Sequence, residues 1–174
     1  MKYLGVDYGE ERVGLAVCDA AETMAFALRT LERRSMPTKE QFFGELLKVI
    51  AEEAIAGIVI GLPLPLDPPP DPALNPLDAH GQSDSENKLE ESLSCRKVRN
   101  FAGRLARRVD LPIYLVNEAL SSSEAETRLQ QAGFKRDKLK ARLDAEAAAV
   151  ILQQFLNLPM EKRIPHEFHT PHPA

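Results

Sequence analysis

The hydrophobic periodicity of the chain changes from strand-like to helical near Thr38, and this change restricts the fold more than any other feature. Three short strand-like segments follow one another at 2–7, 12–18 and 23–31, with no room for a helix between them. Such tight spacing predicts an antiparallel meander. The pattern then turns helical, and a continuous apolar run at 57–62 is typical of a buried parallel strand.

The helical segment has a clear start. Thr38 is expected to cap it, with Gln41 three residues on completing a capping box. Apolar side chains then recur at helical spacing as far as Ala54. The change from a period of two to a period of 3.6 therefore falls just before Thr38.

Helices and strands alternate in the second half of the chain. A helical stripe begins near Cys95, a buried strand covers 112–116, a helix runs from Ser121 to Gly133, and Asp144 begins the last helix. The order is strand-strand-strand-helix-strand-helix-strand-helix-helix. It predicts an α/β fold with a mixed five-stranded sheet, three strands antiparallel and two parallel, flanked by helices. This order matches the RNase H-like fold.

The domain organisation follows from length and local composition. A chain of 174 residues suits one domain, which we place at 1–156. Residues 67–94 hold seven acids and one Lys among many prolines and serines, so we interpret them as a disordered insertion. Residues 157–174 are expected to form a flexible tail.

Composition excludes several classes of protein. No apolar run approaches the roughly 20 residues that a membrane span needs, and the N-terminus enters a strand without a signal-peptide pattern. Cys18 and Cys95 fit no zinc or CxxC spacing. Two reduced thiols in a cytoplasmic protein are the favoured interpretation.

The charge of the chain is unevenly distributed. The net charge is −4, yet 95–142 holds 12 Lys and Arg against 5 Asp and Glu. Segregated charge can form a basic face on an acidic protein, as a nucleic-acid partner requires. Ordinary solvated helix faces would give the same count, and charge alone does not decide between the two.

Three carboxylates stand at the ends of predicted elements. Asp7 closes the first strand, Glu118 follows the last strand, and Asp144 starts the final helix. If they converge, a divalent cation such as Mg²⁺ or Mn²⁺ would relieve their repulsion. Two ions about 4 Å apart can activate a water and stabilise the leaving oxygen of a phosphodiester. The alternative is an N-cap for Asp144 and solvated loops for the other two.

Two further groups of residues are candidates for binding nucleic acid. The turn after Asp7 holds Gly9, whose backbone can approach a phosphate closely, and Arg12, although a plain hairpin turn is the alternative. A run of cations leads directly to Asp144, and we expect it to be a mobile connection that holds a phosphate backbone. Its members are Lys135, Arg136, Lys138, Lys140 and Arg142. A charged loop without a partner is the alternative, and Arg104 is expected on a solvated helix face.

Four ordered stretches resemble the YqgF family, the Holliday-junction-resolvase-like proteins regarded as pre-16S rRNA nucleases. They are LGVDYG at 4–9 with RVGLAVCD at 12–19, IVIGLPL at 58–64, VNEALSS at 116–122 and LDAEAAAVIL at 143–152. The resemblance implies a metal-dependent nuclease whose catalytic and metal-binding acids fall on Asp7, Glu118 and Asp144. It implies pre-rRNA as substrate, processed at the 5′ end of 16S rRNA with ribosomal precursor particles as partners, or branched DNA as the alternative.

The chain departs from the family pattern at three places near the proposed site. Asn117 and Ala119 stand where the family has Asp and Arg, and Glu11 stands where it offers Lys. These changes leave open a catalytically weakened nucleic-acid-binding or ribosome-associated module. The strand-turn DxG also occurs in actin-like ATPases and sugar kinases, but those pair two such domains and this chain offers no second copy.

Overall fold

Five strands form one mixed sheet. The computed structural model of the chain describes residues 1–63, 93–117 and 136–168, with the helix backbone alone over 136–141. In this part the strand order is β3-β2-β1-β4-β5. The strands are β1 (Tyr3–Tyr8), β2 (Arg12–Cys18), β3 (Ala25–Glu32), β4 (Gly57–Leu62) and β5 (Ile113–Asn117). The first three pair antiparallel, while β1, β4 and β5 run parallel, which confirms the predicted mixed sheet.

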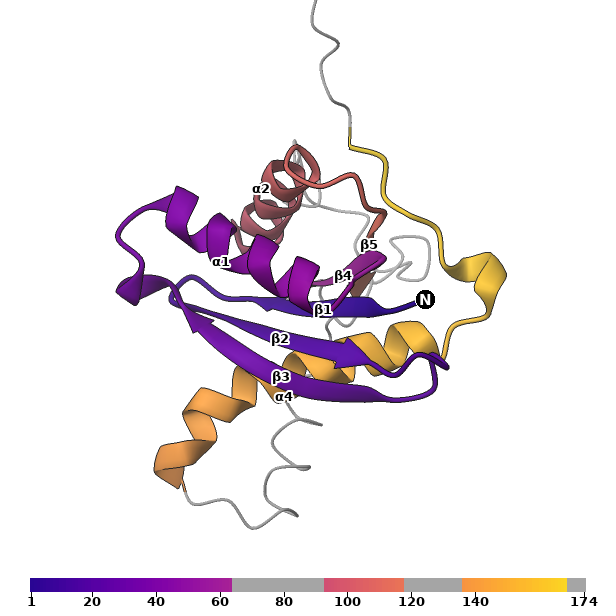
Figure 1. Cartoon of the computed structure of the whole chain (residues 1–174), viewed down its shortest axis with the longest axis horizontal. Coiled ribbons are helices and arrows are strands. Elements are labelled where there is room, and N and C mark those ends of the chain that lie inside the picture. The colour runs from indigo at the N-terminus through magenta and orange to yellow at the C-terminus, as the bar shows by residue number, and fades with distance from the viewer. Residues whose placement is uncertain (64–92, 118–135, 169–174) are drawn as a thin grey trace, which may run out of the picture.

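Helices cover both faces of the sheet (Figure 1). The described helices are α1 (Lys39–Glu52), α2 (Leu93–Ala106) and α4 (Arg136–Leu156), with short 3-10 turns η1 (Arg33–Ser35) and η3 (Met160–Lys162). Helices α1 and α2 lie on one face, and α4 crosses the other. The central strands β1 and β4 are therefore buried on two sides.

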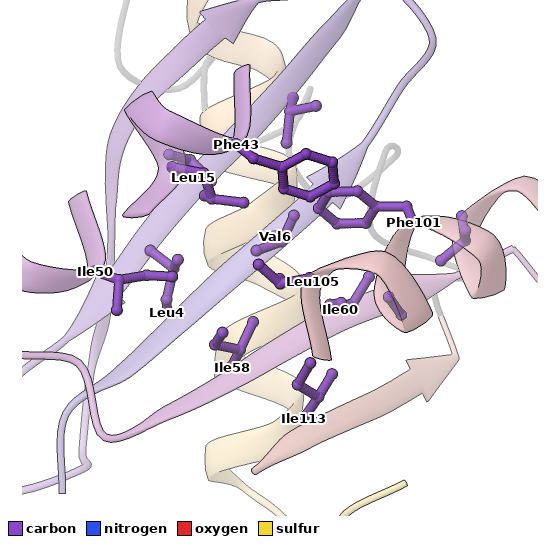
Figure 2. Packing of buried hydrophobic residues seen from close by; sticks show 14 of the residues in the cluster. Leu4, Val6, Leu15, Phe43, Ile50, Ile58, Ile60, Phe101, Leu105 and Ile113 are labelled. Carbon is purple, nitrogen blue, oxygen red and sulfur yellow. The ribbon is translucent and has the colours of Figure 1, made fainter. Parts of the chain in front are cut away.

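The face under α1 and α2 carries the larger core (Figure 2). Leu4 and Val6 of β1 point into it and have no exposed surface. Phe43 of α1 and Phe101 of α2 stack above them with ring centroids 5.9 Å apart. Each buried side chain of this size contributes roughly 1.5–3 kcal/mol, so this layer fixes both helices on the sheet.

The face under α4 is packed more closely, because glycine and alanine meet there. A Cβ added to Gly5 would lie 2.7 Å from the carbonyl oxygen of Ala148, and one added to Gly14 would lie 1.8 Å from that of Asp144. Glycine within a strand often marks such a close approach of another backbone. Helix α4 therefore lies directly against β1 and β2.

Most predicted boundaries agree with the structure, but the start of the last helix was wrong. Thr38 caps α1 as expected, its Oγ accepting from the backbone N–H of Gln41 at 3.2 Å. Helix α4 begins at Arg136 and not at Asp144. The cations before Asp144 were expected to form a mobile connection, but residues 136–142 are helical, because Lys, Arg, Leu and Ala are strong helix formers.

Two other predicted segments lie outside the described residues. The helix expected over 121–133 is one of them. The insertion expected over 67–94 is the other, except that its last two residues, Leu93 and Ser94, begin helix α2.

Residues 157–168, where a flexible tail was expected, pack against the domain. The guanidinium of Arg163 donates to the carbonyl oxygen of Leu156 at 2.6 Å and to the carboxylate of Glu22 at 2.7 Å. The backbone N–H of His166 donates to the carbonyl oxygen of Ile113 in β5 at 2.7 Å. Phe168 contacts the larger core, and residues 169–174 lie outside the described part.

Cys18 and Cys95 are both buried and form no disulfide, as expected. Among the described residues, no helix has the length and hydropathy that crossing a membrane would demand.

Candidate active site

Asp7 lies near the end of β1 on the face that α4 covers. Side chains alternate along a strand, and Gly5, two residues earlier, contacts α4. Asp7 is half-buried and pairs in the sheet with Gly14 of β2. Its carboxylate is therefore directed to the α4 side, at the edge where β1 ends.

Asp144 lies in the third turn of α4, directly above that same glycine. The absence of a side chain at Gly14 lets the Asp144 backbone approach β2. Because Gly14 is also the sheet partner of Asp7, the two acids share one face and one edge of the sheet. The pairing of Asp7 with Gly14 and the contact of Gly14 with Asp144 thus bring the backbones of two of the three predicted acids close together.

Arg12, the first residue of β2, forms an ion pair with Asp144. Its Nε donates to Oδ2 of Asp144 at 2.7 Å, and the two side chains are 36% and 23% exposed. Such half-exposed pairs contribute up to about 1 kcal/mol to stability. The larger effect is geometric, since one carboxylate oxygen is held in a fixed direction. Arg12 was predicted to contact nucleic acid, and here its contact is with a candidate catalytic acid.

The third predicted acid, Glu118, directly follows strand β5 in the sequence. Strand β5 ends at Asn117, which pairs with Leu62 at the end of β4. The parallel strands β1, β4 and β5 all end at this edge. Glu118 itself lies outside the described residues. Within the described part, no three His, Cys, Asp or Glu residues are grouped so that they would hold a metal ion, and the triad geometry stays a prediction.

The turn between β1 and β2 is held on both sides by ion pairs. The backbone N–H of Gly9 donates to the carbonyl oxygen of Arg12 at 2.9 Å, and a Cβ at Gly9 would lie 2.6 Å from that oxygen. Glu10 pairs with Lys97 of α2, and the hydrogen bond from Lys97 lowers the pKa of Glu10. Glu11 pairs with Arg34. The role of Gly9 in binding nucleic acid stays a prediction.

The predicted basic residues lie on the first turns of α4, which extend past the sheet (Figure 1). Arg136, Lys138 and Lys140 are part of this helix, and Lys135 lies outside the described residues. Arg142 is exposed and lines a hollow of about 330 Å³ between α4 and the edge strand β3. Their contact with nucleic acid stays a prediction.

A family model described as "RuvX: Holliday junction resolvase" matches residues 1–158. The chain belongs to the RuvX family. This assignment confirms the resemblance to YqgF proteins seen in the four sequence stretches.

Relatives within the RuvX family match almost the whole chain. A protein of Oleidesulfovibrio alaskensis is 47% identical over 167 residues, covering 96% of this chain and 99% of its own. One from Nitratidesulfovibrio vulgaris is 44% identical over 165 residues, covering 95% and 99%. Each carries the name "Putative pre-16S rRNA nuclease". The predicted enzyme class, a nuclease, is therefore confirmed by the names of these relatives and by the family.

A solved structure shares the fold. Thermus thermophilus RuvC, in complex with a Holliday junction substrate, superimposes with a TM-score of 0.56 at 16% identity and covers 95% of this chain and 99% of its own. At this identity the likeness shows the fold alone. It confirms the predicted RNase H-like architecture of this RuvX-family chain.

Two features of the site escaped sequence reasoning. Gly5 and Gly14 hold α4 against the sheet, and a signal was present, since glycine inside a buried strand marks a close backbone approach. The ion pair of Arg12 with Asp144 joins residues 132 positions apart, and no local pattern announces such a contact.

Proposed function

We propose that this RuvX-family chain is a nuclease that hydrolyses phosphodiester bonds of structured nucleic acid, with the 5′ end of pre-16S rRNA as its substrate. One observation carries the proposal: Gly14 is both the sheet partner of Asp7 and the residue against which the Asp144 backbone packs. The names of relatives that align over nearly their full length support this choice of substrate.

Asp7, Asp144 and Glu118 are the residues that would hold divalent metal ions. Asp7 and Asp144 offer hard oxygen donors from one face, and Glu118 follows a strand that ends at the same edge. This donor set suits Mg²⁺ or Mn²⁺, and a bound cation would offset the mutual repulsion of the acids. When bound, two such ions supply activation of a water and stabilisation of the leaving oxygen.

Arg12 acts in this proposal as a positioning residue. It holds Oδ2 of Asp144 and so fixes the orientation of this carboxylate, whose other oxygen would be the ligand to a bound metal ion. Its positive charge also lowers the cost of gathering acids at one place.

The basic residues beside the acids bind the substrate backbone. Arg142 and the cations that precede it lie on the first turns of α4, next to Asp144 in the same helix. Phosphate contacts of this kind fix the position of a nucleic acid without reading its sequence. Gly9 lets the β1–β2 turn approach a phosphate from the other side. In this account the chain works in the cytoplasm, on pre-rRNA within ribosomal precursor particles.

A four-way DNA junction is the second candidate substrate. The description of the matching family, a Holliday junction resolvase, specifically favours it. Both substrates present phosphodiesters in structured surroundings, so the proposed chemistry is the same for each.

A cleavage panel separates these candidates. The full chain is incubated with Mg²⁺ or Mn²⁺ and one of three substrates: an RNA spanning the 5′ end of pre-16S rRNA, a four-way DNA junction, or an unstructured RNA of equal length. We expect cuts in the precursor RNA that cease with chelator and with Asp144→Asn. Preferential cutting of the junction would reassign the substrate. If no substrate is cut while nucleic acid still binds, the chain is a binding module and not a nuclease.

A further inference from the structure

A second, smaller hollow opens beside the end of β1, on the sheet face opposite to the face of Asp7 and Asp144. Its volume is about 160 Å³. Its lining residues are cationic, amide or aromatic, and no carboxylate is among them: Tyr8, Arg33, Phe42, Lys97, Asn100, Phe101 and Arg104. Lys97, Asn100 and Arg104 share one face of α2, because they recur three and four residues apart. We call this hollow the α2 pocket.

Arg33 is held rigidly at the wall of the α2 pocket. Its Cζ lies 5.3 Å from the ring centroid of Tyr8 and 5.5 Å from that of Phe42. Its Nη1 donates to the hydroxyl of Tyr8 at 2.9 Å and to the carbonyl oxygen of Glu10 at 3.1 Å. Tyr8 in turn stacks on Phe101, with centroids 4.4 Å apart. A guanidinium fixed in this way loses little side-chain entropy when it binds an anion.

The other polar groups of the pocket face the solvent. Arg104 and Asn100 are exposed, and within the described part of the chain their side chains form no hydrogen bond. Lys97 pairs with Glu10 at the surface. An exposed pair of this kind is weak, so that a phosphate can take the place of the Glu10 carboxylate.

The size of the pocket selects its ligand. At about 160 Å³ it is below the roughly 300–1,000 Å³ of typical small-molecule sites, and it suits a phosphate group better than a whole nucleotide. Phe42 and Phe101 are each 4% exposed, and the Tyr8 ring is stacked on Phe101 with Arg33 5.3 Å from its centroid, so the pocket leaves little aromatic surface for a base. The pocket therefore offers mainly positive charge and hydrogen-bond donors, which suit a phosphate.

We propose that the α2 pocket binds a backbone phosphate of the nucleic-acid strand whose scissile phosphate lies at the Asp7–Asp144 site. Tyr8 directly follows Asp7 in β1 and is directed to the opposite face, so a strand that passes over the β1–β2 turn contacts both places. Arg33, Lys97 and Arg104 supply the charge, and Asn100 supplies an amide donor. This inference rests on the proposed function, because it names a second contact of the same substrate.

The test compares three single substitutions by their effect on RNA binding. All are made in the Asp7→Asn background, so that binding is measured without cleavage, on the precursor RNA at 50 and 200 mM salt. Arg104→Gln should remove one phosphate contact. The fall in RNA affinity from 50 to 200 mM salt should therefore be about threefold smaller than in the chain that keeps Arg104. Arg107→Gln, which removes the same charge from an exposed residue outside the pocket, should leave both affinity and salt dependence unchanged. Glu10→Gln should tighten binding about threefold, because it frees Lys97 for the strand.

Each alternative result overturns the inference. If Arg104→Gln and Arg107→Gln weaken RNA binding equally, only the overall positive charge of α2 matters and not the pocket. If Glu10→Gln leaves RNA affinity unchanged or lowers it, Lys97 does not bind the strand. A free nucleotide is the other source of phosphate, so thermal stabilisation by AMP that is lost in Arg104→Gln would reassign the pocket to a small molecule. Arg104-dependent binding of polyglutamate in place of RNA would reassign it to an acidic protein. Cleavage is assayed separately on the parent chain, so loss of the proposed function is distinguishable from loss of the pocket.

Discussion

Gly14→Ala tests the contact on which the whole site depends. A Cβ at this position would lie 1.8 Å from the Asp144 carbonyl oxygen and 2.1 Å from its carbonyl carbon. Ordinary van der Waals contact begins near 3.4 Å, so α4 must move away from β2 by about 1.6 Å. Overpacking costs about 1–3 kcal/mol, and the upper end applies because both partners are backbone. For a domain of this size, 3 kcal/mol lowers Tm by roughly 6–12 °C.

The same shift should disable the chemistry. A displacement of about 1 Å at a reacting group can cost about 100-fold in rate, and Asp144 moves with the helix. Thermal melting and single-turnover cleavage of the precursor RNA measure the two effects. Gly44→Ala is the matched control, because nothing lies within 4 Å of its added Cβ in α1, and it should gain about 0.5–1 kcal/mol. A Gly14→Ala chain that melts with the parent and cleaves at the full rate would refute the reasoning.

Three further predictions concern individual side chains. Asp7→Asn should abolish the stabilisation of the parent by Mn²⁺, which reaches about 2.7 kcal/mol at 100 times Kd, and an undiminished Tm shift in the variant would place the metal elsewhere. Arg12→Gln should lower the cleavage rate while changing Tm little, since the ion pair with Asp144 is half-exposed; an equal loss of both would assign Arg12 a structural role instead. Glu22→Gln should lower Tm at neutral pH, because the hydrogen bond from the N-terminal amino group, and then that from Arg163, hold the pKa of Glu22 below its ordinary value. A carboxylate with a lowered pKa stabilises the fold at pH values above its unfolded-state pKa, and this stabilisation is lost as the pH falls through its folded-state pKa. The melting curves of the two chains should therefore converge in acid and stay apart at pH 7.

Local signals made most of the sheet predictable. Strand β2 occupies the expected residues, because a turn precedes it and Asp19 closes it, its carboxylate accepting from the backbone N–H groups of Thr23 and Met24. Strand β4 also matches, since Gly57 begins the apolar run and a proline follows it. The start of α4 was misplaced because dense positive charge was interpreted as a solvated connection, whereas helix propensity decided the backbone.

Only those features of the candidate site that follow from the position of a residue along its strand or helix could be predicted from the sequence. Asp7 stands at the end of a strand, and the order of elements brings that edge toward the last helix. The packing of Gly14 on Asp144 and the ion pair with Arg12 depend on a helix more than 100 residues away in sequence. The α2 pocket likewise joins Arg33 with Arg104, which sequence reasoning had assigned to a solvated helix face. Such contacts exist only once the tertiary fold has formed.

The most direct test of the central claim is the rate of precursor-RNA cleavage as Mn²⁺ is titrated into the parent chain and into Asp7→Asn. The account predicts that the parent rate rises with Mn²⁺ and saturates. It predicts that the variant, which keeps the shape of the side chain and loses a ligand charge, stays more than about 100-fold slower at every concentration. Equal rates for the two chains, or a parent rate independent of the metal, would contradict the assignment of the active site to Asp7 and Asp144.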